Sequence, residues 1–385
     1  MKFNSKSISY LFLISTLVVI SCKNNETDTK EMVIQENTNE VKLLIGMYTD
    51  SIGRGIYEVN FDQETGQLGE PKLLVETENP SYLTQSTDGN FVYAVNENQE
   101  GSLSAFQWNA DKTKLNLLNQ QPSAGAHPCY ISLNGNQDLL AAANYSSGDF
   151  VVYNRLANGN LDSIAQIKKH TGSGPVKPNQ DAAHAHCAIF GKDQKHLYVV
   201  DLGIDEIASY AINEQNQLGE KMVALALDKG DGPRHLIFHP TKEWAFVINE
   251  LSSTVISAKV DGDKGLFTTI SKANTLPADY SGKNACADIH ISDDGKFLYA
   301  TNRGHNSIAT IAIDDQGGLK TIAQDTIMGD WPRNFMISPN GKFILVANQL
   351  SNNITVFERN KESGLIRYID HQISVSKPVY LSTKL

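Results

Sequence analysis

Pairs of short apolar strands recur along this chain, and each pair ends at an asparagine or an aspartate. Four of the six pairs open just after a proline, and the end points are 46 to 57 residues apart: Asn96, Asn144, Asp201, Asn249, Asn302 and Asn348. A strand-built repeat of about 40–50 residues is typical of one four-stranded blade in a ring of blades. Beyond residue 40 the sequence shows no useful helical periodicity, so we expect an all-β fold.

The two ends of the chain supply one further unit between them. Residues 378–381 repeat the opening strand, and residues 43–48 and 55–60 supply the next two strands. Joining the ends in one blade closes the ring and leaves few unpaired strand edges. We therefore predict a seven-bladed β-propeller over residues 41–385, with N- and C-terminal strands sharing the closing blade.

The N-terminal segment has the features of an export signal. Lys2 and Lys6 precede an apolar run, residues 8–20, that is too short to span a membrane. Residues 19–22, Val-Ile-Ser-Cys, resemble a bacterial lipobox, which predicts a signal peptide over residues 1–21 and lipidation of Cys22. The polar residues 22–40 then form a flexible tether. We expect an exported protein held at the bacterial cell envelope, on the periplasmic or outer membrane face, by its lipid anchor alone.

Composition and missing motifs exclude several functions. The net charge is −10 and no basic cluster appears, so nucleic acid is not an expected partner. The sequence has no P-loop, dinucleotide fingerprint, GxSxG elbow or HExxH motif, and we expect no cofactor. Cys129, Cys187 and Cys286 form no CxxC pair and are interpreted as small buried apolar residues.

Two positions of the repeat carry the candidate chemistry. Aligning the units on their anchors places one set of residues at the start of the first strand: Ser81, Cys129, His186, Arg234, Ala287 and Arg333. A second set lies just past the anchor: Glu97, Tyr145, Leu202, Glu250, Arg303 and Gln349. In a hairpin the start of one strand lies beside the end of the next, so we expect both sets on one rim of the ring, with Arg234 next to Glu250.

Variation at these two positions favours a binding or catalytic site, because a purely structural position would repeat one residue type. Loops and strand ends at one face of a propeller collect functional groups near its central channel. The alternative is a set of solvated rim charges or salt bridges between blades. His184 and His186 form an HxH pair, but no third ligand is evident, so a histidine acting as base or hydrogen-bond donor is favoured over a metal site.

Three motifs resemble the seven-bladed propeller lactonases, a family that includes one type of bacterial 6-phosphogluconolactonase and the fungal carboxymuconate cyclase. The resemblance spans about residues 43–385 and rests on three stretches: residues 183–186 (Ala-His-Ala-His), residues 232–235 (Gly-Pro-Arg-His) with 249–251 (Asn-Glu-Leu), and residues 287–290 (Ala-Asp-Ile-His) with 302–305 (Asn-Arg-Gly-His). In that family the catalytic cluster is one histidine, two arginines and one glutamate. The resemblance places it on His186, Arg234, Arg303 and Glu250.

The resemblance implies a carboxylic ester hydrolase that opens a sugar-acid lactone. His186 or Glu250 is the expected base, with His186 favoured and Glu250 as the residue that orients it, while the arginines bind anions and stabilise the oxyanion. We expect His184, Glu97, Arg333 and His235 to bind substrate. The family's 6-phosphogluconolactonase works in the cytoplasm, whereas this chain has an export signal, so an unphosphorylated lactone is favoured.

Two other functions stay open from the sequence. One is a non-catalytic propeller that binds an anionic sugar or a protein, and the other is a cyclase acting on a muconate-like diacid. In each case we expect a monomer that takes a small molecule or ligand at the charged rim.

Overall fold

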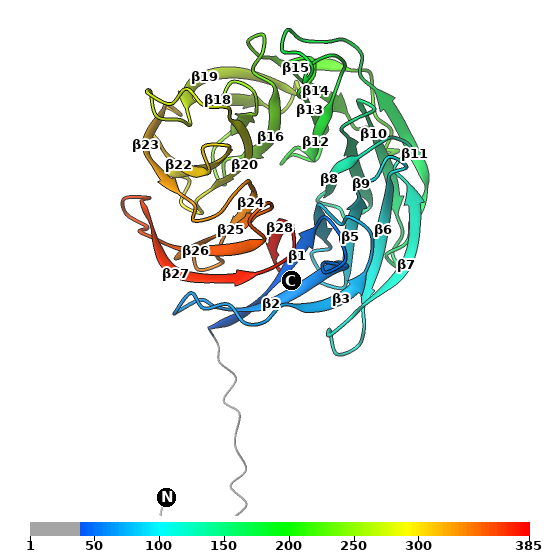
Figure 1. Ribbon diagram of the computed structural model, residues 1–385. Coiled ribbons are helices and arrows are strands. Elements are labelled where there is room, and N and C mark those ends of the chain that lie inside the picture. The colour runs from blue at the N-terminus through cyan, green and yellow to red at the C-terminus, as the bar shows by residue number, and fades with distance from the viewer. Residues whose placement is uncertain (1–38) are drawn as a thin grey trace, which may run out of the picture. The chain divides into compact units, whose positions relative to one another are not determined.

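Seven four-stranded antiparallel sheets surround a central axis in the computed structural model, which describes residues 39–385 (Figure 1). The predicted seven-bladed propeller is confirmed, and its first strand begins one residue before the predicted boundary, at Glu40. The predicted signal peptide, Cys22 and nearly all of the predicted tether lie outside the described residues. Within residues 39–385 no helix is long and apolar enough to cross a membrane.

Each sheet is formed by strands that follow one another in the chain, except for the sheet that joins the termini. That sheet has the order β28-β1-β2-β3, with β1 (Glu40–Met47), β2 (Gly55–Asp62), β3 (Lys72–Glu76) and β28 (Pro378–Thr383). The next three sheets contain β4 (Leu83–Gln85), β5 (Phe91–Asn96), β6 (Ser102–Trp108), β7 (Leu115–Pro122), β8 (Pro128–Leu133), β9 (Leu139–Asn144), β10 (Asp149–Arg155), β11 (Leu161–Lys169), β12 (Ala185–Phe190), β13 (His196–Asp201), β14 (Glu206–Ala211) and β15 (Met222–Ala226). The last three contain β16 (Pro233–Phe238), β17 (Trp244–Asn249), β18 (Thr254–Asp261), β19 (Leu266–Asn274), β20 (Ala285–Ile291), β21 (Phe297–Arg303), β22 (Ser307–Ile313), β23 (Leu319–Thr326), β24 (Pro332–Ile337), β25 (Phe343–Asn348), β26 (Asn353–Arg359) and β27 (Ile366–Ser374).

The closing blade brings the two ends of the described chain together as the sequence predicts. Strand β28 pairs antiparallel with β1, with Leu381 opposite Ile45 and Pro378 opposite Met47. Gln85 of the following blade donates from Nε2 to the main-chain oxygen of Thr383 over 2.8 Å, which links β4 to β28. The seven inner strands therefore form a complete ring, in which every inner strand has a neighbour on both sides.

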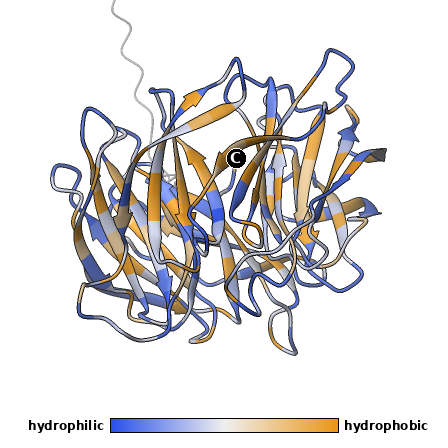
Figure 2. Ribbon diagram, turned by 90° about the horizontal axis from the view of Figure 1, so that it is seen from above, coloured by the Kyte–Doolittle hydropathy of each residue, from blue (hydrophilic) through white to orange (hydrophobic). Residues whose placement is uncertain are grey.

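The core lies between the blades. The second strand of most blades is buried along its whole length, as in β5, β9, β13 and β25, because neighbouring blades cover both of its faces. The outermost strands are mostly exposed or half-buried, as in β19. Figure 2 shows this distribution, with apolar strands inside and polar loops at the two rims. Each fully buried leucine or valine contributes about 1.5–3 kcal/mol, so the scaffold that holds the rims is stable.

The repeated anchors have a structural role. Their side chains are buried, and four of the six bind the segment that arrives from the preceding blade, whereas Asn249 and Asn348 bind a threonine of their own blade. Asn144 donates from Nδ2 to the main-chain oxygen of Ser123 over 2.8 Å, and Asn302 does the same to Thr275 over 3.1 Å. The anchor thus fixes where the second strand ends, and the residue just past it enters the rim at the same place in each blade.

Candidate active site at the channel mouth

A β-bulge at the start of the inner strands places the candidate side chains. In five blades the pairing with the second strand skips one residue, and the skipped residues are Cys129, His186, Arg234, Arg333 and Val379. Strand β20 has the same irregularity between Cys286 and Ile289. A bulge sets two residues of one strand against one of its partner and redirects the extra side chain. The bulged residues therefore turn toward the channel, where four of the six residues that follow the anchors also point: Glu97, Tyr145, Glu250 and Arg303.

The two sets of residues enclose a cavity of about 250 Å³ at one mouth of the channel. Its lining combines both repeat positions and consists of Tyr48, Glu97, Cys129, Tyr145, His186, Glu250, Arg303 and Arg333. A narrower void of about 10 Å³ adjoins it, shares Glu97, Cys129 and Arg333 with it, and reaches Arg234. A larger depression of about 720 Å³ is lined by Lys342 and by residues of β26, β27 and the loop between them. None of its lining residues occupies either repeat position, so we assign the site to the channel mouth.

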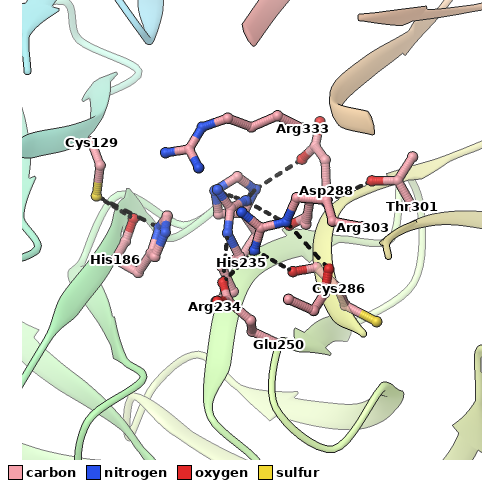
Figure 3. Close-up of polar contacts among 12 residues, drawn as sticks. Cys129, His186, Arg234, His235, Glu250, Cys286, Asp288, Thr301, Arg303 and Arg333 are labelled. Carbon is pink, nitrogen blue, oxygen red and sulfur yellow. Dashed lines mark hydrogen bonds and ion pairs between the residues drawn. The ribbon is translucent and has the colours of Figure 1, made fainter. Parts of the chain in front are cut away.

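Glu250 lies between two arginines that come from neighbouring blades. One carboxylate oxygen, Oε2, is 3.2 Å from Nε of Arg234 and 2.8 Å from Nη2 of Arg303, as Figure 3 shows. Arg303 also donates to the main-chain oxygens of Ala285 and Cys286 at 3.2 and 3.1 Å. The residues that the sequence places side by side, Arg234 and Glu250, therefore form an ion pair in the site.

His186 has a different partner from the one expected. Its Nδ1 lies 3.6 Å from the sulfur of Cys129 (Figure 3), and within the described residues its Nε2 has no hydrogen-bond partner. Glu250, which the sequence suggested as the orienting residue, is held by the arginines instead, so that part of the interpretation is wrong. Burial, with Arg234 close by, holds the pKa of His186 well below 6.5. The imidazole is therefore neutral at physiological pH.

The opposite wall of the cavity centres on Glu97. Its carboxylate accepts hydrogen bonds from the Tyr48 hydroxyl over 2.8 Å and from the Ser81 hydroxyl. Arg333 lies 3.7 Å from the same carboxylate, and its guanidinium covers the Tyr48 ring at 5.3 Å from the ring centre. Glu97 and Arg333, both predicted to bind substrate, therefore line the cavity.

The other two predicted substrate-binding residues lie behind the cavity lining. His184 stacks on Tyr145 with ring centres 4.6 Å apart, and its Nδ1 is 2.9 Å from the main-chain oxygen of Tyr145. His235 is buried under Arg234, whose Nη1 lies 3.0 Å from its Nε2. Neither lines the 250 Å³ cavity, but His235 lines the adjoining narrow void together with Arg234, whereas His184 lines neither space.

Positive charge exceeds negative charge among the side chains that line the cavity and its narrow end. Three guanidinium groups, those of Arg234, Arg303 and Arg333, face the two carboxylates of Glu97 and Glu250. Burial and the two neighbouring arginines lower the pKa of Arg234 to about 10, which leaves it charged at neutral pH. In a chain with an acidic overall charge, this mouth of the channel attracts an anion or a developing oxyanion.

The sequence reasoning missed three lining residues. Tyr48 follows Met47, which pairs with Pro378 as Asn249 pairs with Pro233, so Tyr48 occupies in the closing blade the position of Glu250. Extending the alignment to the closing blade would have found it. Tyr145 was aligned but given no role, and Cys129 was interpreted as an ordinary core residue. All three cysteines of the described chain are free and buried, but only Cys129 among them lines the cavity.

Within residues 39–385, no three His, Cys, Asp or Glu side chains come together in a way that holds a metal ion. The two histidines of the HxH pair lie in different surroundings. His186 faces the cavity, whereas Nε2 of His184 lies 3.4 Å from Asp181 outside it.

We expect the free energy of unfolding to fall as the pH is lowered from about 6.5 to about 4. Burial, then the Arg234 charge, lowers the pKa of His235 from its usual 6.5 to about 4. The unfolded chain binds a proton in this window that the folded chain excludes, so the stabilisation is complete above pH 6.5 and is lost progressively down to pH 4. For His235 alone, the free energy of unfolding falls by about 3 kcal/mol over this pH range. Urea unfolding at several pH values measures it, and His235→Gln should flatten the slope; an unchanged slope contradicts the assignment.

Comparison with known proteins gives one consistent result. The family model described as Lactonase, 7-bladed beta-propeller matches residues 42–383. The chain is 32% identical to 6-phosphogluconolactonase of Bacillus subtilis over 339 residues, covering 87% of this chain and 96% of the relative. It is 36% identical to 6-phosphogluconolactonase of Formosa agariphila over 348 residues, covering 87% and 97%. The solved structure of a periplasmic gluconolactonase from Pseudomonas aeruginosa matches with a TM-score of 0.85 and 31% identity, covering 90% and 99%.

Proposed function

The chain belongs to the family of seven-bladed β-propeller lactonases and is a lactone hydrolase, and we propose that it opens sugar-acid lactones in the channel-mouth cavity. A lactone is a cyclic ester, so the reaction is a carboxylic ester hydrolysis. One observation supports our assignment of the reaction to this cavity. A neutral histidine with an unpartnered nitrogen lines the cavity beside guanidinium groups that favour negative charge.

His186 fits the role of general base. The Cys129 sulfur lies 3.4 Å from the main-chain oxygen of His186 and 3.8 Å from that of Ala143, so the thiol proton has carbonyl acceptors. The sulfur then accepts the Nδ1 proton of His186, which leaves the Nε2 lone pair for a water molecule. Burial raises the pKa of the Cys129 thiol, so it stays protonated and is a poor nucleophile.

The arginines fit the role of oxyanion stabilisers. The narrow end of the site is lined by Arg234, Arg333 and His235, and the ring centre of His186 lies 5.4 Å from that of His235. A carbonyl oxygen directed into this end meets two fixed positive groups where negative charge develops. Both guanidinium groups are already held by ion pairs, so they need little rearrangement during the reaction.

In the proposed reaction, water attacks the lactone carbonyl carbon while Nε2 of His186 takes one of its protons. The carbonyl π electrons move to oxygen, giving a tetrahedral oxyanion next to Arg234 and Arg333. When this intermediate collapses, the carbonyl re-forms, the bond to the ring oxygen breaks, and protonated His186 returns its proton to that oxygen. One water is consumed, and the product is a hydroxy acid that ionises at neutral pH.

The rest of the cavity suits a small polyhydroxylated ring. Pockets for drug-sized ligands measure about 300–1,000 Å³, and this cavity of about 250 Å³ suits a single sugar ring. Glu97 and Glu250 offer carboxylate oxygens to hydroxyl groups, while Tyr48 and Tyr145 offer flat faces on which a ring can pack. Every lining residue comes from one chain, and we propose that the protein acts as a monomer.

We also propose that the enzyme is exported and held by lipid on Cys22, where it meets unphosphorylated lactones. The N-terminal sequence supports this proposal, and the Pseudomonas aeruginosa relative is named as a periplasmic gluconolactonase. In cells labelled with a fatty acid, wild type should carry the label in the membrane fraction and Cys22→Ser should not. Label retained by Cys22→Ser would refute the anchor.

A lactone panel tests the activity itself. Purified protein is added to glucono-1,5-lactone, its 6-phosphate and several other lactones, and acid release is followed at constant pH. We expect clear acceleration over the spontaneous rate, with kcat/KM for gluconolactone at least equal to that for the phosphate. A protein that gluconate stabilises in a thermal shift, but that leaves every lactone at its spontaneous rate, is a binding propeller and not a hydrolase.

A further inference from the structure

One of the three arginines at the channel mouth has N–H donors without an acceptor. Nη2 of Arg333 is 3.7 Å from Oε1 of Glu97, which is longer than a hydrogen bond. Within residues 39–385 no acceptor lies closer to its guanidinium, although only 16% of the side chain is exposed. Figure 3 shows the side chain extended across the site, with no contact drawn to its guanidinium. Donors that are shielded in this way normally have partners, so we expect a ligand to accept from Arg333.

The other two arginines already donate to the protein. Nη1 of Arg234 donates to the main-chain oxygen of Ala287 over 2.6 Å, and Arg303 donates to two main-chain oxygens of β20 at 3.2 and 3.1 Å. Both also contact Oε2 of Glu250, at 3.2 and 2.8 Å. Arg333 is therefore the arginine of the site with the most donors left for a ligand.

Glu97 does not close over Arg333, because each of its oxygens has another donor. Oε1 accepts from the Tyr48 hydroxyl over 2.8 Å, and Oε2 accepts from the Ser81 hydroxyl. The Arg333 guanidinium covers the Tyr48 ring instead, at 5.3 Å from the ring centre. Packing thus holds the guanidinium in place while its N–H groups stay open. A fork of this kind binds a carboxylate through two parallel hydrogen bonds.

The charge of the lining side chains favours an anion over a neutral ligand. Three arginines face two carboxylates, and His186 is neutral because its pKa is held well below 6.5 by burial and by Arg234. The next carboxylate inward, Asp288, lies behind His235, and its second oxygen already contacts three other nitrogen donors. A neutral lactone gains little from the excess positive charge, whereas an anion of the same size is attracted by it.

The proposed reaction produces such an anion in the site. Ring opening consumes one water, and the acid that forms releases a proton to solvent, so a neutral lactone becomes a carboxylate. One carboxylate oxygen is the former oxyanion beside Arg234 and Arg333, and the other comes from the water that His186 activated. The product therefore carries its charge next to the open donors of Arg333, and it binds more tightly than the lactone.

We propose that Arg333 clamps the carboxylate of the ring-opened acid, so that the enzyme is competitively inhibited by its product and by other sugar-acid anions. The inference rests on the proposed lactone hydrolysis, because that reaction defines the product. It assigns to the site a second class of ligand, small polyhydroxylated carboxylates, that binds without being turned over. Lactone opening then slows as the acid accumulates, before the lactone is exhausted.

Gluconate and gluconamide are the probes, because they share one carbon skeleton and differ only in a carboxylate or a neutral carboxamide at C1. Titration calorimetry on the wild-type protein should give a Kd for gluconate about 10- to 150-fold below that for gluconamide, the factor expected for hydrogen bonds to a charged group. Gluconate should also inhibit lactone opening competitively. Equal affinities for the two probes, or no binding of gluconate, overturns the proposal.

Two amide variants should change the gluconate Kd in opposite directions. Arg333→Gln removes the fork and its charge, and should raise this Kd about 10- to 150-fold with little effect on gluconamide. Glu97→Gln removes the competing carboxylate 3.7 Å away and should lower it. Arg333→Lys keeps the charge without the fork and should lie between wild type and Arg333→Gln. If Arg333→Gln weakens both probes equally, its role is structural and the clamp is contradicted.

The matched control is Arg359→Gln. Arg359 is a buried arginine outside the cavity that donates to the Tyr299 hydroxyl and to the main-chain oxygen of Gly341, so its loss should lower the melting temperature and leave both Kd values unchanged. Calorimetry does not depend on turnover. If wild type opens no lactone, the proposed hydrolysis fails, and the two Kd values still decide whether Arg333 selects a carboxylate. If wild type is active but binds both probes equally, only the clamp fails.

Discussion

Replacing His186 with glutamine is expected to lower kcat by about 10²–10⁴-fold, the usual contribution of a general base. The amide fills the space of the imidazole but takes up no proton at neutral pH. Within the described residues, His186 is the cavity-lining histidine, and its Nε2 has no protein partner. The reaction is followed by acid release from gluconolactone, with the spontaneous rate subtracted.

The pH profile supplies a second test of the same residue. The base works unprotonated, so kcat/KM should stay level as the pH falls below 6.5 and decline only when the lowered pKa of His186 is reached. His239→Gln is the matched control, since His239 is also a buried histidine but binds the main-chain nitrogens of Thr241 and Lys242 at a hairpin turn. If His186→Gln keeps more than about a tenth of wild-type kcat, the base is another group.

Replacing Arg234 with alanine is expected to lower kcat by about 10²–10³-fold, the loss seen when one oxyanion donor is removed. The substitution takes away a positive charge at the narrow end of the cavity and leaves Glu250 with Arg303 alone. Arg234→Lys should recover only part of the loss, because an ammonium group lacks the fork that contacts Glu250 and His235 together.

A buried arginine elsewhere in the ring controls for stability. Arg359 is as buried as the site arginines and donates to the Tyr299 hydroxyl over 2.6 Å and to the main-chain oxygen of Gly341 over 3.0 Å. Arg359→Ala should lower the melting temperature without a comparable effect on kcat. Equal losses of kcat in the Arg234 and Arg359 variants, each measured on folded protein, would mean that Arg234 acts only on stability.

The blade repeat could be predicted from sequence because strand pairing and turn chemistry are local. Each anchor lies at or next to the end of a second strand as expected: Asn249 is the last residue of β17, and Asn302 is the last but one of β21. Residues 378–381 pair with β1. Strict alternation of apolar and polar residues predicted the strands less well than the repeat did. Second strands such as β25 are buried on both faces by neighbouring blades, and a burial pattern of that kind depends on contacts between distant residues.

The candidate site could be predicted in part. The repeat alignment placed His186, Arg234 and Glu250 on one rim, and the structure brings them to one channel mouth. The partners were not predictable, because they depend on which way each side chain turns at a bulge. Glu250 was expected beside His186 but pairs with two arginines, and His186 instead lies beside Cys129.

The sequence by itself determined the number of blades, the closure by the two ends and the rim positions at which charged residues gather, because these follow from a repeat whose units fold locally. Only the tertiary structure decided the roles within that rim. A one-residue bulge reverses the side to which a side chain points, and it placed His235 under Arg234 instead of in the cavity. Contacts between side chains on different blades are set by the packing of the whole ring, and no local pattern encodes them.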